Sequence, residues 1–141
     1  MHYSALILSL DCYTVGMSEN SNKERAVQFL KLMSSGKVDE AYDQFTSPIG
    51  KHHSPHFPAG FDALKEAMKQ SYQRFPSKQS EIKHVVGEDN MVAVHSHVVL
   101  TPGDPGFAIV HLFRFENEKI VELWDFTQPI LEDSPNTDGP F

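Results

Sequence analysis

The stretch FAIVHLFRFENEKIVELWDFTQP, residues 107–129, predicts two adjacent β-strands joined by a tight turn. Apolar and aromatic residues fill both arms. The polar segment 116–119 between them contains an asparagine, a residue that tolerates positive φ in hairpin turns. Asp125 follows Trp124 inside the second arm. Because a carboxylate in an apolar strand costs free energy unless it is hydrogen-bonded or takes part in chemistry, Asp125 is the first candidate functional residue.

The rest of the chain predicts three helices followed by strands. Apolar residues recur at helical spacing in segments 26–33, 38–45 and 61–75. From residue 77 the period becomes that of strands, expected at 79–88, 91–100, 107–116 and 119–128. The segment 47–60 contains three prolines, which exclude a central strand, so we expect a loop there. Helices followed by an antiparallel meander predict an α+β domain.

Composition limits the classes of function. The chain has 141 residues, of which 40% are hydrophobic, enough for one domain with a packed core. A formal net charge of -7, without a cluster of lysines or arginines, argues against nucleic acid and anionic membranes as partners. The single cysteine, Cys12, excludes an intramolecular disulfide and a multi-cysteine zinc site. No apolar run is long enough to span a membrane, and we expect a cytoplasmic location.

The two ends differ in composition from the predicted domain at residues 18–130. Residues 1–17 form an N-terminal extension whose segment 5–10 resembles a weak signal-peptide core, without a basic start or a clear cleavage site. Met17 is an alternative natural start. Residues 131–141 are rich in turn formers and end in an aromatic residue, which predicts a C-terminal tail.

The segment FRFENEKIVELWDFTQP resembles the C-terminal signature of the SnoaL-like proteins, which belong to the nuclear transport factor 2-like superfamily. The family pattern is roughly F-R-x-x-N-G-K-I-x-E-x-W-D-x-x-Q. Two further parts match: His53-Ser54-Pro55 with Gly60 shortly after, and VAVHSH at 92–97. The resemblance covers about residues 20–135. It implies a cone-shaped barrel, in which three N-terminal helices pack on a curved, mostly antiparallel sheet around an internal pocket.

The resemblance also implies site residues. In SnoaL-type cyclases, the aspartate matching Asp125 is the acid/base residue, and a histidine matching His111 assists it, although many relatives carry aspartate there. His53 matches the histidine of the family's H-N-P motif and is expected to close the cone. A histidine beside a carboxylate can have its pKa raised towards the range useful for proton transfer, and an aspartate in an apolar pocket can have its pKa raised as well. The alternative for Asp125 is a structural acid bonded to a backbone N–H.

Whether His111 and Asp125 meet depends on the register of the hairpin. With a clean two-residue turn at 117–118, counting back from the turn places His111 opposite Trp124, so that Asp125 lies on the other face of the sheet. The two side chains share a face only if a β-bulge or an odd-length loop shifts the register by one residue. The pair therefore predicts an irregularity between Phe113 and Asp125.

His95 and His97 share parity on strand 91–100, so their side chains leave the same face. Both faces of this strand are largely apolar, which predicts a sheet covered on both sides. We expect the helices to cover one face and a second copy of the chain to cover the other, giving a homodimer through the sheet. The two histidines are expected on the inner face, where they would contact the substrate together with Phe113 and Trp124. The alternatives are core or interface histidines bonded to carbonyls, and packing on the sheet face for Trp124.

The favoured function is a cofactor-free acid/base enzyme, an aldol-type cyclase, isomerase or hydratase, acting on a small apolar carbonyl compound. Asp125 would remove an α-proton, and His111 or His53 would donate a hydrogen bond to the enolate. The alternative is a non-catalytic module that binds a small ligand or dimerises. A metal site of His95, His97 and His111 is less favoured, because no acidic ligand follows the H-x-H pair. No metal or cofactor is therefore expected.

For three other polar residues we predict a structural role or exposure to solvent. We expect His52 and His56 to be exposed. We expect Arg114 to form an ion pair with an acid such as Glu122.

Overall fold

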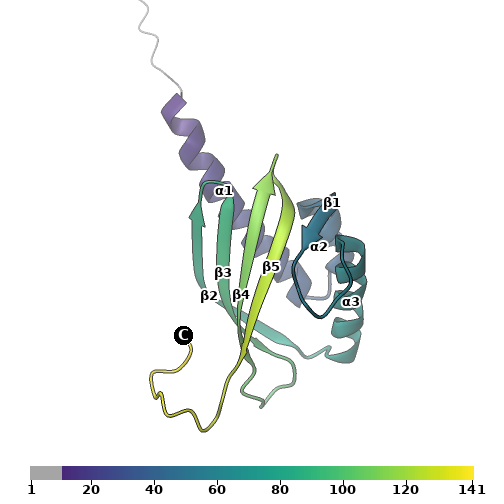
Figure 1. The fold of residues 1–141 in the computed structure, drawn as a ribbon, viewed down its shortest axis with the longest axis vertical. Helices are drawn as coiled ribbons and strands as arrows, with labels where there is room; N and C mark the ends of the chain where they lie inside the picture. Colours follow the sequence, from purple (N-terminus) through teal and green to yellow (C-terminus); the bar gives the residue numbers. More distant parts are fainter. Residues whose placement is uncertain (1–10) are drawn as a thin grey trace, which may run out of the picture.

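The computed structural model describes residues 11–141, with side chains from residue 21 onward. Three helices precede or interrupt a set of five strands (Figure 1): α1 (Asp11–Ser34), α2 (Val38–Phe45), β1 (Thr46–His52), α3 (Phe61–Arg74), β2 (Gln79–Glu88), β3 (Met91–Val99), β4 (Phe107–Glu116) and β5 (Lys119–Pro129). The three helices and the last four strands agree with the prediction to within a residue or two at most ends. The exception is α1, which begins at Asp11 and continues through Met17. The segment that resembles a signal peptide lies outside the described residues.

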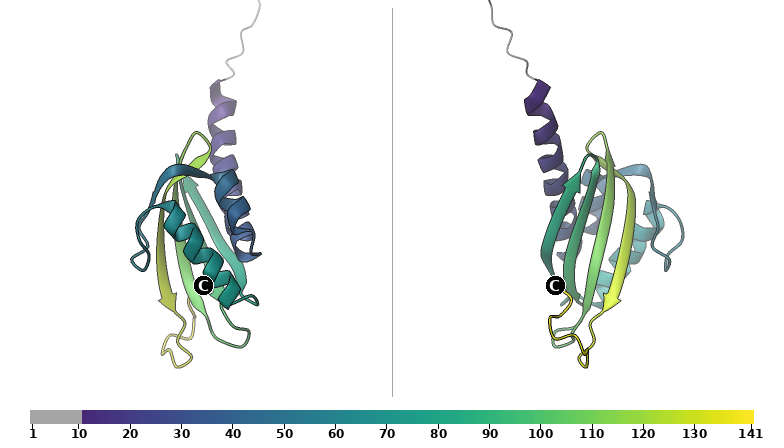
Figure 2. Two further views of the ribbon diagram at one scale, coloured as in Figure 1. Left: turned by 90° about the vertical axis from the view of Figure 1, so that its right-hand side faces the viewer. Right: turned by 60° about the vertical axis from the view of Figure 1, so that its left-hand side comes forward.

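The five strands form one sheet in the order β1-β5-β4-β3-β2. Neighbouring strands are antiparallel except for β1, which pairs with β5 in parallel. All three helices lie on one face of this sheet, and the first half of α1 extends beyond its end (Figures 1 and 2). Three helices on one face of a mostly antiparallel sheet are the α+β arrangement that was predicted. We call the face towards the helices the inner face and the opposite one the outer face.

The first strand was not predicted. The segment expected to be a loop forms β1, an edge strand that contains Pro48. Proline is excluded from the centre of a sheet because it lacks an N–H donor, but an edge strand needs hydrogen bonds on one side only. The pairing of β1 with β5 is irregular between Thr46 and Lys51, consistent with that missing donor. The chain from His53 to Gly60 then crosses to α3 without regular structure.

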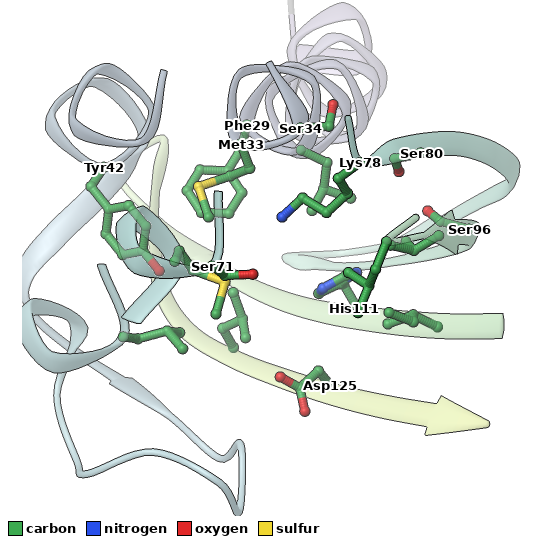
Figure 3. A pocket seen from close by; sticks show the side chains of 17 residues that line it. Phe29, Met33, Ser34, Tyr42, Ser71, Lys78, Ser80, Ser96, His111 and Asp125 are labelled. Atoms are coloured by element: carbon green, nitrogen blue, oxygen red, sulfur yellow. The ribbon is translucent and has the colours of Figure 1, made fainter. Parts of the chain in front are cut away.

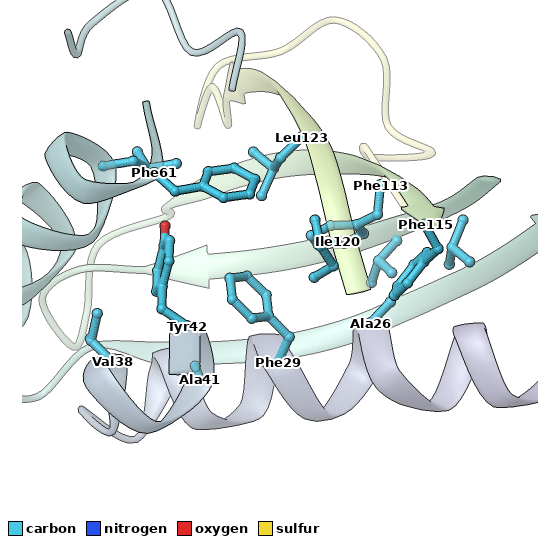
Figure 4. Packing of buried hydrophobic residues seen from close by; sticks show 13 residues of the cluster. Ala26, Phe29, Val38, Ala41, Tyr42, Phe61, Phe113, Phe115, Ile120 and Leu123 are labelled. Carbon is cyan, nitrogen blue, oxygen red and sulfur yellow. The ribbon is translucent and has the colours of Figure 1, made fainter. Parts of the chain in front are cut away.

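The core joins α1 and α2 to the inner face. Ala26 and Phe29 of α1 are buried against the sheet, together with Phe113 from β4 (Figure 4). Val92 and Val94 from β3 belong to the same buried cluster. The ring of Phe29 meets the rings of Tyr42 and Phe113 edge-on, at centroid distances of 5.4 and 5.8 Å, a geometry that aromatic pairs prefer.

Gly36 makes the turn between α1 and α2. Its φ is +82°, and a Cβ at this position would collide with the ring of Tyr72. Only glycine satisfies both conditions without strain. Within residues 11–141, no helix is both long enough and apolar enough to cross a membrane.

Candidate functional site

A cavity of about 210 Å³ lies between the helices and the inner face of the sheet (Figure 3). Most of its wall is apolar, built from α1, α3 and the inner residues of β3, β4 and β5. Among the described residues, eight polar side chains line it: Ser34, Tyr42, Ser71, Lys78, Ser80, Ser96, His111 and Asp125. An apolar hollow with a few convergent polar groups is the usual form of a small-molecule site.

His111 and Asp125 face each other across β4 and β5. The hairpin has a two-residue turn, with positive φ at Asn117 (48°) and Glu118 (67°), as type I′ turns require. On its own, this turn would put the pair on opposite faces of the sheet. The register shifts, however, between Arg114↔Glu122 and Phe115↔Ile120, so one residue of β5 bulges.

The bulged residue is Val121, and beyond it His111 is the direct partner of Asp125. The irregularity predicted between Phe113 and Asp125 is therefore present. Directly opposed residues in an antiparallel pair have Cβ atoms about 5 Å apart. Both side chains line the cavity, and Figure 3 shows them on the same wall.

Burial controls the protonation of His111. Desolvation lowers the pKa of His111 from 6.5 to about 4, and the nearby negative charge of Asp125 offsets this only in part. This is the opposite of the raised pKa that the neighbouring carboxylate led us to expect. The ring keeps some accessible surface, but its Nδ1 atom is buried and has no hydrogen-bond partner among the residues that the structure describes. His111 is consequently neutral near pH 7, and Nε2 is left as the ring nitrogen available to a ligand.

Two further polar groups on the wall were missed by the sequence reasoning. Ser96 is 1% exposed, and its Oγ also lacks a hydrogen-bond partner within the described part of the chain. It lies diagonally across from His111, because Val94 pairs with His111 and Ser96 with Ile109. Tyr42 of α2 directs its hydroxyl towards the cavity (Figure 3). Burial raises the pKa of Tyr42, so the phenol remains a neutral donor.

His95 and His97 do not line the cavity, and the prediction that they contact a ligand there is wrong. They point to the outer face, because Val92, Val94 and Ser96, of opposite parity, are buried against the helices. The Nε2–H of His97 donates to the carbonyl of Pro105 at 2.8 Å. This is the carbonyl-bonded histidine that was the alternative reading.

His95 belongs to a small cluster on the outer face. Its Nδ1 lies 3.1 Å from Nδ1 of His84 on β2, and the two rings stack. The ring of Phe141, at the end of the tail, contacts both His95 and His97. The tail thus folds back over the sheet of its own chain.

His53 and Trp124 are also outside the cavity. The Nε2–H of His53 donates to Oε1 of Glu122 at 2.7 Å, and its ring stacks on Trp124 at a centroid distance of 4.8 Å. His53 therefore does not close the cone. Arg114 makes the predicted ion pair with Glu122 at 2.9 Å. Hydrogen bonds from His53 and Arg114 lower the pKa of Glu122, so this network holds a carboxylate in its charged form.

His52 was expected to be exposed, but it is buried at 8% exposure. Its Nε2–H donates to the carbonyl of Pro58 at 2.6 Å, and its Nδ1 accepts from the backbone of Ser54. His52 thereby ties the loop after β1 to itself, which the sequence pattern did not indicate. His56 is exposed, as predicted.

The three-imidazole metal site does not form. His111 lies on the inner face, whereas His95 and His97 lie on the outer face, with the sheet between them. Among the residues whose side chains the structure describes, no group of three histidine, cysteine, aspartate or glutamate side chains could hold a metal ion.

Of the predicted site residues, the structure brings His111 and Asp125 together in the cavity. Phe113, also on the inner face, is fully buried, with its ring stacked 6.0 Å from that of His111, so it supports the histidine from within the core. Lys78 is the charged residue of the cavity wall that sequence reasoning missed. It lies between α3 and β2, where no periodic pattern indicates the direction of a side chain.

Comparisons with known proteins agree with this fold. The model of the SnoaL-like domain family matches residues 26–123, more than half of the chain. No curated protein sequence matches this chain.

Many solved structures are similar. A nuclear transport factor 2-like protein of unknown function from Burkholderia xenovorans has a TM-score of 0.68 at 15% identity, covering 82% of this chain and 89% of the other. AclR, a proposed hydroxylase from Streptomyces galilaeus, has a TM-score of 0.67 at 20% identity, with coverages of 78% and 90%. A proposed polyketide cyclase from Bacillus cereus has a TM-score of 0.66 at 20% identity, with coverages of 77% and 74%.

At these identities the structural likeness establishes the fold alone, and the two of these proteins whose names state an activity already differ in it. The family match, the helices on one face of the sheet and the internal cavity are consistent with one another. The chain belongs to the SnoaL-like domain family and has the nuclear transport factor 2-like fold.

Proposed function

We propose that this protein is an acid/base enzyme that acts on a small apolar carbonyl compound without a cofactor, in an aldol-type cyclisation, isomerisation or hydration. The observation that carries the proposal is the direct pairing of Asp125 with a neutral, buried imidazole in an otherwise apolar cavity. Titratable groups that converge in an apolar hollow are typical of catalytic sites. The name of the similar protein from Bacillus cereus, a proposed polyketide cyclase, is compatible with this chemistry.

In the proposed reaction, Asp125 removes the proton from the carbon next to the carbonyl group. The C–H electron pair moves into the carbon framework and leaves negative charge on the carbonyl oxygen as an enolate. Because His111 is neutral, it can take part in a hydrogen bond without first losing a proton. The unpaired Nδ1 of His111 and Oγ of Ser96 lie on the same wall of the cavity. Buried polar groups without partners are rare and call for an explanation, and a functional role for this wall would provide one.

The test uses proton exchange, because exchange requires no knowledge of the final product. The protein is incubated in D₂O with a panel of small apolar ketones and β-dicarbonyl compounds, and deuterium uptake next to the carbonyl group is followed by NMR. We expect Asp125→Asn to slow the catalysed exchange by a factor of about 10²–10⁴, the usual contribution of a general base.

Glu122→Gln is the matched control, since it removes a carboxylate from the outer face of the same strand. Glu122→Gln should exchange at nearly the wild-type rate. Exchange at the wild-type rate by Asp125→Asn would refute the role of Asp125. A wild-type protein that binds members of the panel without exchanging them would favour the ligand-binding alternative.

The outer face favours a second, compatible role in association. Cross-strand register brings Val86, Leu112 and Trp124 into one row, beside Val110 and Phe126 in the next; we call these five residues the outer apolar patch. Val86 is 64% exposed and Phe126 is 60% exposed, and monomeric proteins rarely leave large contiguous apolar patches in water. We propose that a second copy of the chain covers this patch, in a two-fold contact that joins the same surface of both copies.

Light scattering coupled to size-exclusion chromatography measures the mass directly. We expect a dimer for the wild type and a monomer for Phe126→Glu, because a buried unpaired carboxylate opposes the contact. Ile49→Glu, at an 88% exposed position on β1 outside the patch, should remain dimeric. A monomeric wild type at all concentrations would end this proposal.

A further inference from the structure

Lys78 brings a cationic side chain into the cavity. Of the seventeen described residues that line the cavity, Lys78 is the only lysine or arginine, and Asp125 is the only acid. In Figure 3, Lys78 reaches into the hollow from the side of α1, whereas Asp125 lies on β5. The cavity thus has a cationic end and an anionic end, with His111 on the wall.

Lys78 differs from the other cations that the structure describes. Lys65, Lys69 and Arg114 form ion pairs with surface carboxylates. Lys78 is half-buried, and its pKa is lowered by desolvation, with no compensating acid or hydrogen-bond acceptor among the side chains from residue 21 onward. A partly desolvated ammonium without a partner costs free energy that a bound negative group would recover.

We propose that the Lys78 ammonium binds an anionic oxygen of the ligand, and that in the reaction this oxygen is the enolate oxygen formed when Asp125 removes the α-proton. The catalytic part rests on the proposed function, whereas the binding of an anionic oxygen does not. A fixed positive charge aimed at developing negative charge is among the largest contributions to catalysis in a water-poor site. The proposal narrows the substrate to compounds whose carbonyl oxygen can reach Lys78 while a C–H bond on the adjacent carbon lies at Asp125.

A phenol that ionises near neutrality is a suitable probe, because its phenolate imitates an enolate. Para-nitrophenol is small enough for a cavity of about 210 Å³, and its ionised form absorbs visible light. The pKa of the bound phenol is obtained by titrating the absorbance of the complex. We expect binding to wild type to stabilise the phenolate, and Lys78→Gln to raise the pKa of the bound phenol by about one pH unit or more, the effect of removing one nearby opposite charge.

Two variants control the comparison. Lys78→Arg keeps the charge and should retain the wild-type pKa of the bound phenol. Lys51→Gln removes an exposed lysine from β1, outside the cavity, and should also behave as wild type. If Lys78→Gln and wild type bind the phenolate equally well, or if wild type shows no preference for the phenolate over the phenol, the anion site is refuted.

The same variants separate this inference from the proposed function. In the proton-exchange assay, Lys78→Gln should slow exchange, and Lys78→Arg should restore it in part. A Lys78-dependent phenolate signal without any proton exchange would establish an anion-binding pocket in a non-catalytic protein. Exchange that depends on Asp125 but not on Lys78 would leave the enzyme in place and remove Lys78 from its mechanism.

Discussion

The two faces of the sheet carry the same types of residue in different environments. On the inner face, His111 lies among apolar side chains with Nδ1 unpaired, and burial keeps it neutral. On the outer face, His97 bonds a carbonyl and His53 bonds Glu122. The difference teaches that a histidine in a strand has no fixed chemistry. The face on which it lies decides whether it is satisfied by its neighbours or left available to a ligand.

The same contrast holds for aromatic residues on the neighbouring strands β4 and β5. Phe113 on the inner face is 0% exposed and contacts the rings of Phe29 and Phe115. Phe126 on the outer face remains largely in solvent. The inner face therefore supplies the packed core, and the outer face is the one through which we propose that copies associate.

The largest effect on stability is expected when these two phenylalanines are each replaced by alanine. Phe113→Ala should lower the free energy of unfolding by about 3–5 kcal/mol, because it removes buried surface and leaves a cavity. Phe126→Ala should change it by no more than about 0.5 kcal/mol in the monomer. Urea denaturation at two protein concentrations measures both. The cost of Phe126→Ala should grow with concentration only if copies associate through the outer apolar patch, and equal costs for the two variants would contradict the assignment of faces.

A smaller effect is expected in the dependence of stability on pH. The unfolded chain protonates His111 near pH 6.5, whereas the folded chain resists protonation down to about pH 4. Between these values the unfolded state binds more protons, so stability falls as the pH falls. The loss attributable to His111 is about 2.5 kcal/mol when the pH is lowered from 6.5 to 4, and it fades out within about one pH unit above 6.5.

His111→Leu should flatten the urea midpoint against pH in this window, relative to wild type. His56→Leu, which removes an exposed imidazole, is the control for loss of one histidine. A slope for His111→Leu equal to that of wild type would show that His111 is not held neutral by burial.

The number and order of most elements could be read from periodicity. Three features reflect interactions between residues close in sequence: the helical spacing from residue 26, the alternation after residue 77 and the turn at Asn117. Each can therefore be recognised from a short stretch of sequence. The edge strand β1 was not predicted, because the prolines of its segment indicated a loop. A proline excludes a central strand but not an edge strand. The helix α1 begins earlier than its apolar pattern, since its first half extends past the sheet and has no inner face to cover (Figure 1).

The faces were harder to assign. Both faces of β3 are largely apolar. Because His95 and His97 share one of them, we expected that face to be the inner one, and this prediction was wrong. The more consistently aliphatic side, Val92, Val94 and Val98 with Ser96, was the better indicator of the core. His53 fits the family motif in sequence, yet Glu122 and Trp124 hold it on the outer side of β5.

The sequence by itself determined the α+β class, the family and the hairpin at residues 107–129, and it singled out Asp125 as a candidate, because each depends on local spacing or on a contiguous motif. Only the tertiary structure decided that Asp125 meets His111. That meeting requires the extra residue at Val121, and a bulge is a property of how two strands pair. The protonation of His111 and the place of Lys78 in the cavity were likewise decided by burial, which arises only when distant segments pack together.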